Sequence, residues 1–290
     1  MPRKLTPGSV TAENLIRLLS SDGQVRLVVV DVTEPLRTSR LREVTAHAAQ
    51  ELYKQIYTNC ALLRGLLGEE ERVSVNLRFR GEGRFCHAAV DGLGNIHCSF
   101  SEALRTFDGD PRELVGEGAT LSITRGSWTG GMFTGTVELP QDSLDQCFTH
   151  FYRQSEQLET VFHSWTTAEP IRGCLVQPLP SAVHASVRAL VKRVQEASAR
   201  LQTTAWDDIE SVFASFARVV GRGAVRSECY CSKEMLRGLL AACDLEELER
   251  AIAQEDGLEV ECGLCGRKYR YDGGDLQAVV DLKRKVGAWD

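Results

Sequence analysis

Four cysteines near the end of the chain form two pairs whose spacing suits a single metal ion. Cys229 and Cys231 have one residue between them, Cys262 and Cys265 have two, and 30 residues separate the pairs. In an extended segment residues i and i+2 point to the same side, so the first pair can chelate one ion together. Zinc takes four thiolates in a tetrahedron, and such a closed site is structural. The spacing therefore predicts one Zn²⁺ per chain in the reduced protein, held by Cys229, Cys231, Cys262 and Cys265.

Residues 227–290 are predicted to form a small α+β unit around this ion. They number 64 and include few large apolar side chains, and a core of that size supplies roughly 3–5 kcal/mol. A structural zinc ion contributes roughly 10–16 kcal/mol in small modules. We therefore expect the unit to be folded with the metal and largely unfolded without it.

Cap and turn residues predict the elements of this unit. Ser232 is expected to begin one short helix, Asp244 with Glu247 a second, and Asp275 a final one. Residues 258–260 and 268–271 are expected to form a hairpin around the second cysteine pair.

Oxidation of the thiols would reverse the folding of the unit. A disulfide sulfur is no longer a thiolate ligand, so peroxide or hypochlorous acid, which start the oxidation of a thiolate, would release the metal. The cysteine pattern thus predicts a switch that is folded when reduced and open when oxidised.

The composition restricts the class of protein. Of 290 residues 43% are hydrophobic and 26% charged, and no apolar run is long enough to span a bilayer. The net charge of −6 disfavours a general nucleic-acid binder. Ten cysteines without a secretory signal indicate thiols in a reducing compartment, so we expect a cytoplasmic protein. The basic start of the chain leaves an organelle transit peptide as the alternative.

Residues 1–180 are predicted to form a core domain of mixed sheet and helix, which makes the whole chain α+β. Alternation of apolar and polar residues predicts a meander of strands at 73–80, 84–91 and 95–100. The other expected elements are a strand at 25–32, a long helix at 38–67, a hairpin of 120–125 with 132–139, a helix capped by Asp142 and running to about 158, and a strand at 173–179.

Residues 181–226 are predicted to be a helical linker that packs on the core domain. One helix is expected at 181–201 and another from Thr204, with Trp206, Phe213 and Phe216 in its apolar stripe. The default role of this stripe is packing.

Two other classes of protein share parts of this cysteine pattern. A static zinc module that binds nucleic acid or a protein partner would need a basic face with interleaved aromatics, and residues 267–271 have that character locally among acidic neighbours. A thiol oxidoreductase would begin a helix at its Cys-x-x-Cys, whereas a strand-like run follows here. The six remaining cysteines lie in apolar patterns and are expected to be packed and inert: Cys60, Cys86, Cys98, Cys147, Cys174 and Cys243.

These motifs resemble the heat shock protein 33 family. The cysteine pattern, followed by Tyr269 and an acidic turn, is similar to its C-terminal zinc domain, and residues 151–158 resemble its Tyr-x-x-Ser-Glu-Gln segment. Residues 173–180 resemble its Gly-Gly-x-Leu-x-Gln-x-x-Pro strand, except that Arg172 replaces the first glycine. Residues 81–84 also depart from the family, with Gly-Glu-Gly-Arg for Gly-Asp-Gly-Pro.

The resemblance implies a redox-regulated, ATP-independent holdase chaperone that is not an enzyme. Oxidation would form the disulfides Cys229–Cys231 and Cys262–Cys265, release zinc and loosen the linker. Unfolding client proteins would then bind uncovered hydrophobic surface, for which Trp206, Phe213 and Phe216 are the candidates. The family also implies a homodimer of the oxidised form, and no nucleic-acid or membrane partner is expected.

Overall fold

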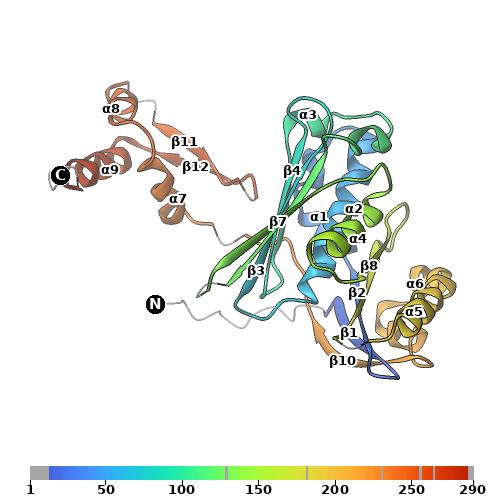
Figure 1. The fold of residues 1–290 in the computed structure, drawn as a ribbon. Helices are drawn as coiled ribbons and strands as arrows, with labels where there is room; N and C mark the ends of the chain where they lie inside the picture. Colours follow the sequence, from blue (N-terminus) through green and yellow to red (C-terminus); the bar gives the residue numbers. More distant parts are fainter. Residues whose placement is uncertain are drawn as a thin grey trace. The chain divides into compact units, whose positions relative to one another are not determined.

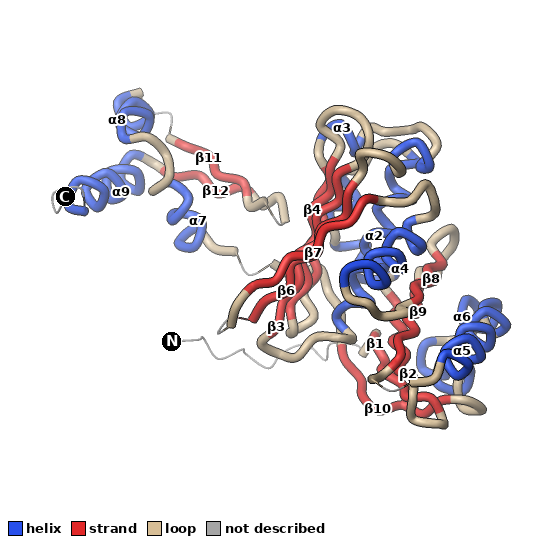
Figure 2. The backbone as a smooth tube through the Cα atoms, in the orientation of Figure 1, coloured by secondary structure: helices blue, strands red, loops and turns tan. Residues whose placement is uncertain are grey.

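The structure, a computed structural model, describes residues 13–127, 130–180, 182–229, 231–254, 257–263 and 265–286. The chain divides after Glu228 into two compact units, called here the first and the second unit. The residues expected to form a linker belong to the first unit. Figure 1 gives the order of the elements, and Figure 2 shows that both units contain helices and strands.

One antiparallel sheet of the first unit is the predicted meander extended by the predicted hairpin. Its strand order is β5-β4-β3-β6-β7, and every second residue of β3 is buried, as expected of a sheet with one covered face. Its strands are β3 (Glu71–Arg78), β4 (Phe85–Asp91), β5 (Ile96–Phe100), β6 (Thr120–Ser127) and β7 (Met132–Glu138).

A second antiparallel sheet of the first unit joins segments from opposite ends of the unit. Its order is β10-β1-β2-β9-β8, so the last strand of the unit pairs with the first. Strands β2 and β9 match the predicted strands, whereas β1, β8 and β10 were not predicted. The strands are β1 (Leu15–Ser20), β2 (Val25–Asp31), β8 (Val161–Trp165), β9 (Arg172–Pro178) and β10 (Ala217–Gly223).

Helix α2 (His47–Arg64) is the central helix of the first unit, because it contacts β4 and β5 of one sheet and β2, β8 and β9 of the other. Helix α4 (Leu144–Ser155) packs beside it, and Ser143 rather than Asp142 caps α4 by accepting a hydrogen bond from the amide of Gln146. Shorter elements are α1 (Thr33–Thr38), η1 (Arg40–Glu43), α3 (Glu102–Arg105) and η2 (Pro111–Leu114).

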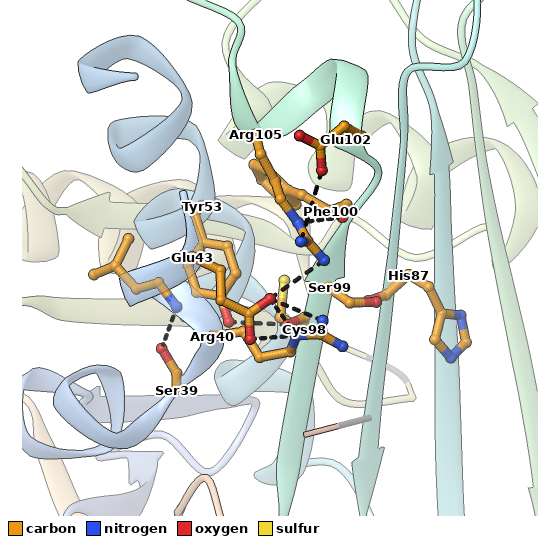
Figure 3. A network of polar contacts seen from close by, with 11 residues as sticks. Ser39, Arg40, Glu43, Tyr53, His87, Cys98, Ser99, Phe100, Glu102 and Arg105 are labelled. Carbon is orange, nitrogen blue, oxygen red and sulfur yellow. Dashed lines mark hydrogen bonds and ion pairs between the residues drawn. The ribbon is translucent and has the colours of Figure 1, made fainter. Parts of the chain in front are cut away.

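The prediction of one helix over residues 38–67 was wrong in its first third, where polar contacts hold the backbone in a different conformation. The amides of Thr45 and Ala46 donate to the carbonyl of Arg105 instead of continuing a helix. In Figure 3 Glu43 lies between the guanidinium groups of Arg40 and Arg105, at 2.8 and 3.3 Å. Long-range pairing with α3 therefore decides where α2 begins.

The prediction of a helix from Thr204 was also wrong. Residues Trp206–Val212 form a short 3₁₀ helix, η3, and the chain then continues into β10. Strand β10 pairs with β1 along its whole length, with Ala217 opposite Ser20. The first linker helix is divided into α5 (His184–Glu196) and α6 (Ser198–Thr203). The linker sequence is thus built into the second sheet.

The second unit contains the elements predicted for it. They are α7 (Lys233–Leu240), α8 (Leu245–Ala253), β11 (Leu258–Glu261), β12 (Lys268–Tyr271) and α9 (Gly273–Val286). Ser232 caps α7 by accepting from the amide of Met235. Asp244 makes no side-chain cap at α8, so that predicted capping box is absent. Asp275 and Asp272 accept hydrogen bonds from each other's amides at the start of α9.

The packing of α2 on β9 requires glycine at position 173. A Cβ there would lie 2.6 Å from Cγ2 of Thr58 and 3.1 Å from Cδ1 of Leu62. Gly173→Ala should therefore lower the free energy of unfolding of the first unit by about 1–3 kcal/mol, as overpacked cores do. Urea unfolding measures this. Gly223→Ala is the control, because its Cβ would meet nothing closer than 3.7 Å, and an equal loss in both variants would contradict the packing argument.

Candidate metal centre

The hairpin of β11 and β12 positions the second cysteine pair. Its strands pair from Leu258 opposite Tyr271 to Glu261 opposite Lys268, so Cys262 comes directly after the first strand. The amide of Gly266 donates to the carbonyl of Cys262 at 2.8 Å, and Gly266 has a φ of +71°. This left-handed conformation is easy for glycine and closes a tight turn, which brings both sulfurs of the pair to one side.

The four cysteine sulfurs meet in one cluster. All four Sγ atoms lie within 4.8 Å of one another, with 3.8 Å between Cys229 and Cys262 and 3.5 Å between Cys231 and Cys265. A tetrahedron of sulfurs at about 2.3 Å from a zinc ion has edges of about 3.8 Å. The donor set therefore fits a tetrahedral thiolate site. Within the described part of the chain no other group of His, Cys, Asp or Glu meets in this way.

The surroundings of the cluster are mostly apolar. Cys262 is 3% exposed and Cys231 9%, while Cys229 and Cys265 are half-buried. Burial raises the pKa of the Cys229 and Cys265 thiols, and hydrogen bonds shared with neighbouring thiols contribute to the shift. A buried group of thiolates needs a compensating positive charge, and a divalent cation is the charge that the geometry accommodates.

Two tyrosines of β12 support the cluster, a role that was not predicted for either of them. The Tyr269 hydroxyl donates to the carbonyl of Cys231 at 2.7 Å and lies 3.2 Å from its sulfur. The Tyr271 side chain is fully buried, and its hydroxyl donates to the carbonyl of Lys233 at 2.6 Å. In the sequence, their alternation around Arg270 indicates a strand but not this role. The partners of both hydroxyls lie 38 residues away along the chain.

Two residues of β12 make contacts within the second unit. Tyr271 is part of the apolar core of the second unit, and Lys268 pairs with Glu259 at 2.8 Å. A strand, and not a helix, follows Cys265, which agrees with the argument against a thioredoxin-type motif.

The other cysteines lie outside this cluster. Five are buried, and burial raises the pKa of the Cys147 and Cys174 thiols to about 12. Burial also raises the pKa of the Cys60 and Cys86 thiols. The prediction that they are packed is confirmed for Cys60, Cys86, Cys98, Cys147 and Cys174, whereas Cys243 is half-buried.

The aromatic residues expected to bind clients lie in the first unit. Phe213 and Phe216 are 0% and 8% exposed and meet edge to face, with ring centroids 5.7 Å apart. They belong to an apolar cluster between the second sheet and the elements α5, α6 and η3, and Trp206 packs at its margin. In this state the three side chains are packing residues, so a role in client binding requires the cluster to open.

Known proteins of one family resemble this chain over nearly its whole length. The family profile described as Hsp33 protein matches residues 13–272. The 33 kDa chaperonin of Lactiplantibacillus plantarum is 25% identical over 94% of this chain and 99% of its own length. That of Levilactobacillus brevis is 26% identical over 93% and 98%. The crystal structure of the Thermotoga maritima 33 kDa chaperonin superposes with a TM-score of 0.78 at 18% identity, covering 94% of this chain and 99% of that one.

The chain belongs to the Hsp33 family. Its curated relatives carry the name of a chaperonin and not of an enzyme, and the structural match supports the same α+β fold. In the described ranges no helix combines the length and apolarity needed to cross a membrane.

The cluster geometry predicts that each of its four cysteines contributes to metal affinity and that Cys243, which lies outside the cluster, does not. Cys231→Ser removes one corner of the tetrahedron and should weaken Zn²⁺ binding by more than about 100-fold, since even changes behind the ligands cost 10- to 100-fold. Competition with a chromophoric chelator measures the affinity. Cys243→Ser is the matched control, and equal affinity of the two variants would exclude Cys231 as a ligand.

Proposed function

We propose that this protein is a redox-regulated, ATP-independent holdase chaperone whose switch is the cluster of Cys229, Cys231, Cys262 and Cys265. The observation that carries the proposal is the meeting of four sulfurs at tetrahedral spacing in a chain of the Hsp33 family. Zn²⁺ is the proposed ion, one per reduced chain, because closed all-thiolate sites of this geometry suit it. When bound, it would supply the crosslink and the positive charge that the thiolates need.

Oxidation would take the ligands away in pairs. Two thiols and one peroxide give one disulfide and two waters, so two peroxides convert the cluster into Cys229–Cys231 and Cys262–Cys265. Sulfurs within 4.8 Å of one another can reach either a local or a crossed pairing. We favour the local pairs because the family resemblance implies them. Disulfides that close loops of a few residues restrain an unfolded chain little, so the second unit would lose its crosslink and unfold.

The chain that leads into the second unit could transmit its unfolding to the apolar cluster of the first unit. The chain just before Cys229 is held by polar contacts: the Ser227 hydroxyl lies 2.6 Å from that of Tyr57, and Arg226 donates to the side chain of Asn95 at 3.0 Å. Directly upstream are β10, an edge strand of the second sheet, and η3, which packs on the apolar cluster containing Phe213. We propose that unfolding of the second unit loosens this stretch and exposes the cluster to unfolding client proteins. Dimerisation of the oxidised form stays a prediction.

Thiol reduction would restore the ligands, so the proposal includes a reducing compartment such as the cytoplasm. The clients are proposed to be proteins that expose apolar surface under oxidative stress, since the cluster offers apolar contacts in place of a polar site.

The switch is tested by following zinc and chaperone activity in one sample. The reduced protein should contain one zinc per chain and hold a thermally unfolding client weakly. Peroxide at mild heat should release the zinc, form the two local disulfides and raise the suppression of client light scattering. Disulfide mapping by mass spectrometry accompanies the assay. Zinc retained with no gain of activity would leave a static zinc module.

The client-binding role of the aromatic cluster is tested by substitution. Phe213→Ser with Phe216→Ser should weaken client holding by the oxidised protein several-fold, because two large apolar surfaces are lost. Phe133→Ser is the control, since Phe133 lies on β7 of the other sheet and is 80% exposed. Light scattering of the client at equal chaperone concentration is the readout. Unchanged holding by the double variant would exclude these phenylalanines.

A further inference from the structure

Arg172 is a buried arginine at a position where the resembled family has glycine. It is the first residue of β9 and is 3% exposed. A buried guanidinium is costly unless its donors are paired and hydrogen-bonded. The surroundings of Arg172 therefore indicate what the side chain does in this chain.

The guanidinium of Arg172 joins the second sheet to the end of α6. Its Nε donates to Oδ2 of Asp31 at 2.8 Å, and Asp31 lies opposite it in the register of β2 and β9. Its Nη1 donates to the carbonyls of Leu201 and Thr204, each at 2.7 Å. The last carbonyls of a helix have no partner within the helix, so one side chain satisfies two of them.

The same guanidinium also contacts the element that follows α6. It lies over the ring of Trp206, 5.6 Å from the ring centroid, at the start of η3. A second polar link joins this covering segment to the sheet, since the indole nitrogen of Trp165 donates to the hydroxyl of Ser198 at 2.8 Å. Both links attach residues 198–212 to strands β8 and β9.

This segment covers the apolar cluster of the second sheet. Leu201 and Ile209 of the segment, and Phe213 directly after it, are all almost fully buried. They belong to one cluster with Ile16, Leu18, Leu27, Val29 and Val176 of the sheet. Lifting the segment would therefore expose apolar surface on both sides and would break the contacts of Arg172 with Leu201, Thr204 and Trp206 in the same movement.

We propose that Arg172 is a clamp that holds residues 198–212 on the second sheet and sets how readily the apolar cluster opens. The clamp lies in the first unit and involves no cysteine, so it restrains the cluster separately from the thiolate switch. Its consequence for clients rests on the proposed function: the clamp would keep the reduced protein closed and raise the threshold for activation. Arg172 acts as a positioning residue, because it holds the covering segment and is not itself the client surface.

The clamp is tested in the reduced, zinc-loaded, full-length protein. Arg172→Met removes the charge and the hydrogen bonds but keeps a long apolar side chain. Amide exchange across residues 198–212 should become at least about tenfold faster, because local opening is governed by local contacts. Exchange of β3, β4 and β6 should stay within about twofold of wild type, and zinc content and free thiols should be unchanged. Binding of a hydrophobic dye to the reduced protein should rise.

Three further variants complete the test. Arg37→Met is the matched control, because Arg37 makes exposed ion pairs with Glu34 and Glu169, and it should leave exchange of residues 198–212 unchanged. Asp31→Asn keeps the shape of the pair and should accelerate the same amides if Arg172→Met does not fold. Arg172→Lys keeps a charge near Asp31 and should restore part of the protection lost in Arg172→Met.

Two outcomes would overturn the clamp. One is unchanged exchange of residues 198–212 in both Arg172→Met and Asp31→Asn. The other is equal acceleration throughout the first unit, which would make Arg172 an ordinary stability residue. Neither depends on oxidation, so a wild-type protein that fails to gain holdase activity would reject the proposed function and leave the exchange result standing.

Discussion

We propose that the folding of the second unit depends on the four cysteine sulfurs, because its apolar core is small. Its apolar core is a single small cluster that includes Cys231, Cys262 and the ring of Tyr271. Both cysteine pairs close the ends of the segment that contains α7, α8 and β11, so a metal ion at the cluster crosslinks most of the unit. A core of this size is marginal without such a crosslink, so the proposed loss of the four ligands would unfold the unit.

The first unit has a different constraint: the elements that cover its second sheet lead directly along the chain into one strand of that sheet. The elements α5, α6 and η3 cover one face of the second sheet, and β10 then pairs with β1 as part of that same sheet. The segment that we propose to open is thus attached at one end to an edge strand and in its middle to Arg172. Polar contacts of this kind fix a geometry without adding the large apolar area that would make opening prohibitive.

Sequence reasoning located what depends on near neighbours and missed what depends on distant ones. The cysteine pairs, the hairpin around them and the strand meander follow from spacing and alternation within short windows. The start of α2 did not, because it is set by the carbonyl of Arg105, about 60 residues away. Strand β10 was predicted as helix because its partner, β1, lies some 200 residues upstream. The hydroxyl of Tyr269 near Cys231 likewise becomes visible only when the two cysteine pairs are brought together.

Metal removal from the reduced protein, followed by amide exchange, tests the central claim most directly. The account predicts that a chelator abolishes the protection of α7, α8, β11, β12 and α9, while the amides of β3, β4 and β6 remain protected. Protection of the second unit that persists without metal would show that its core folds unaided, and would contradict the thiolate cluster as the interaction that holds it.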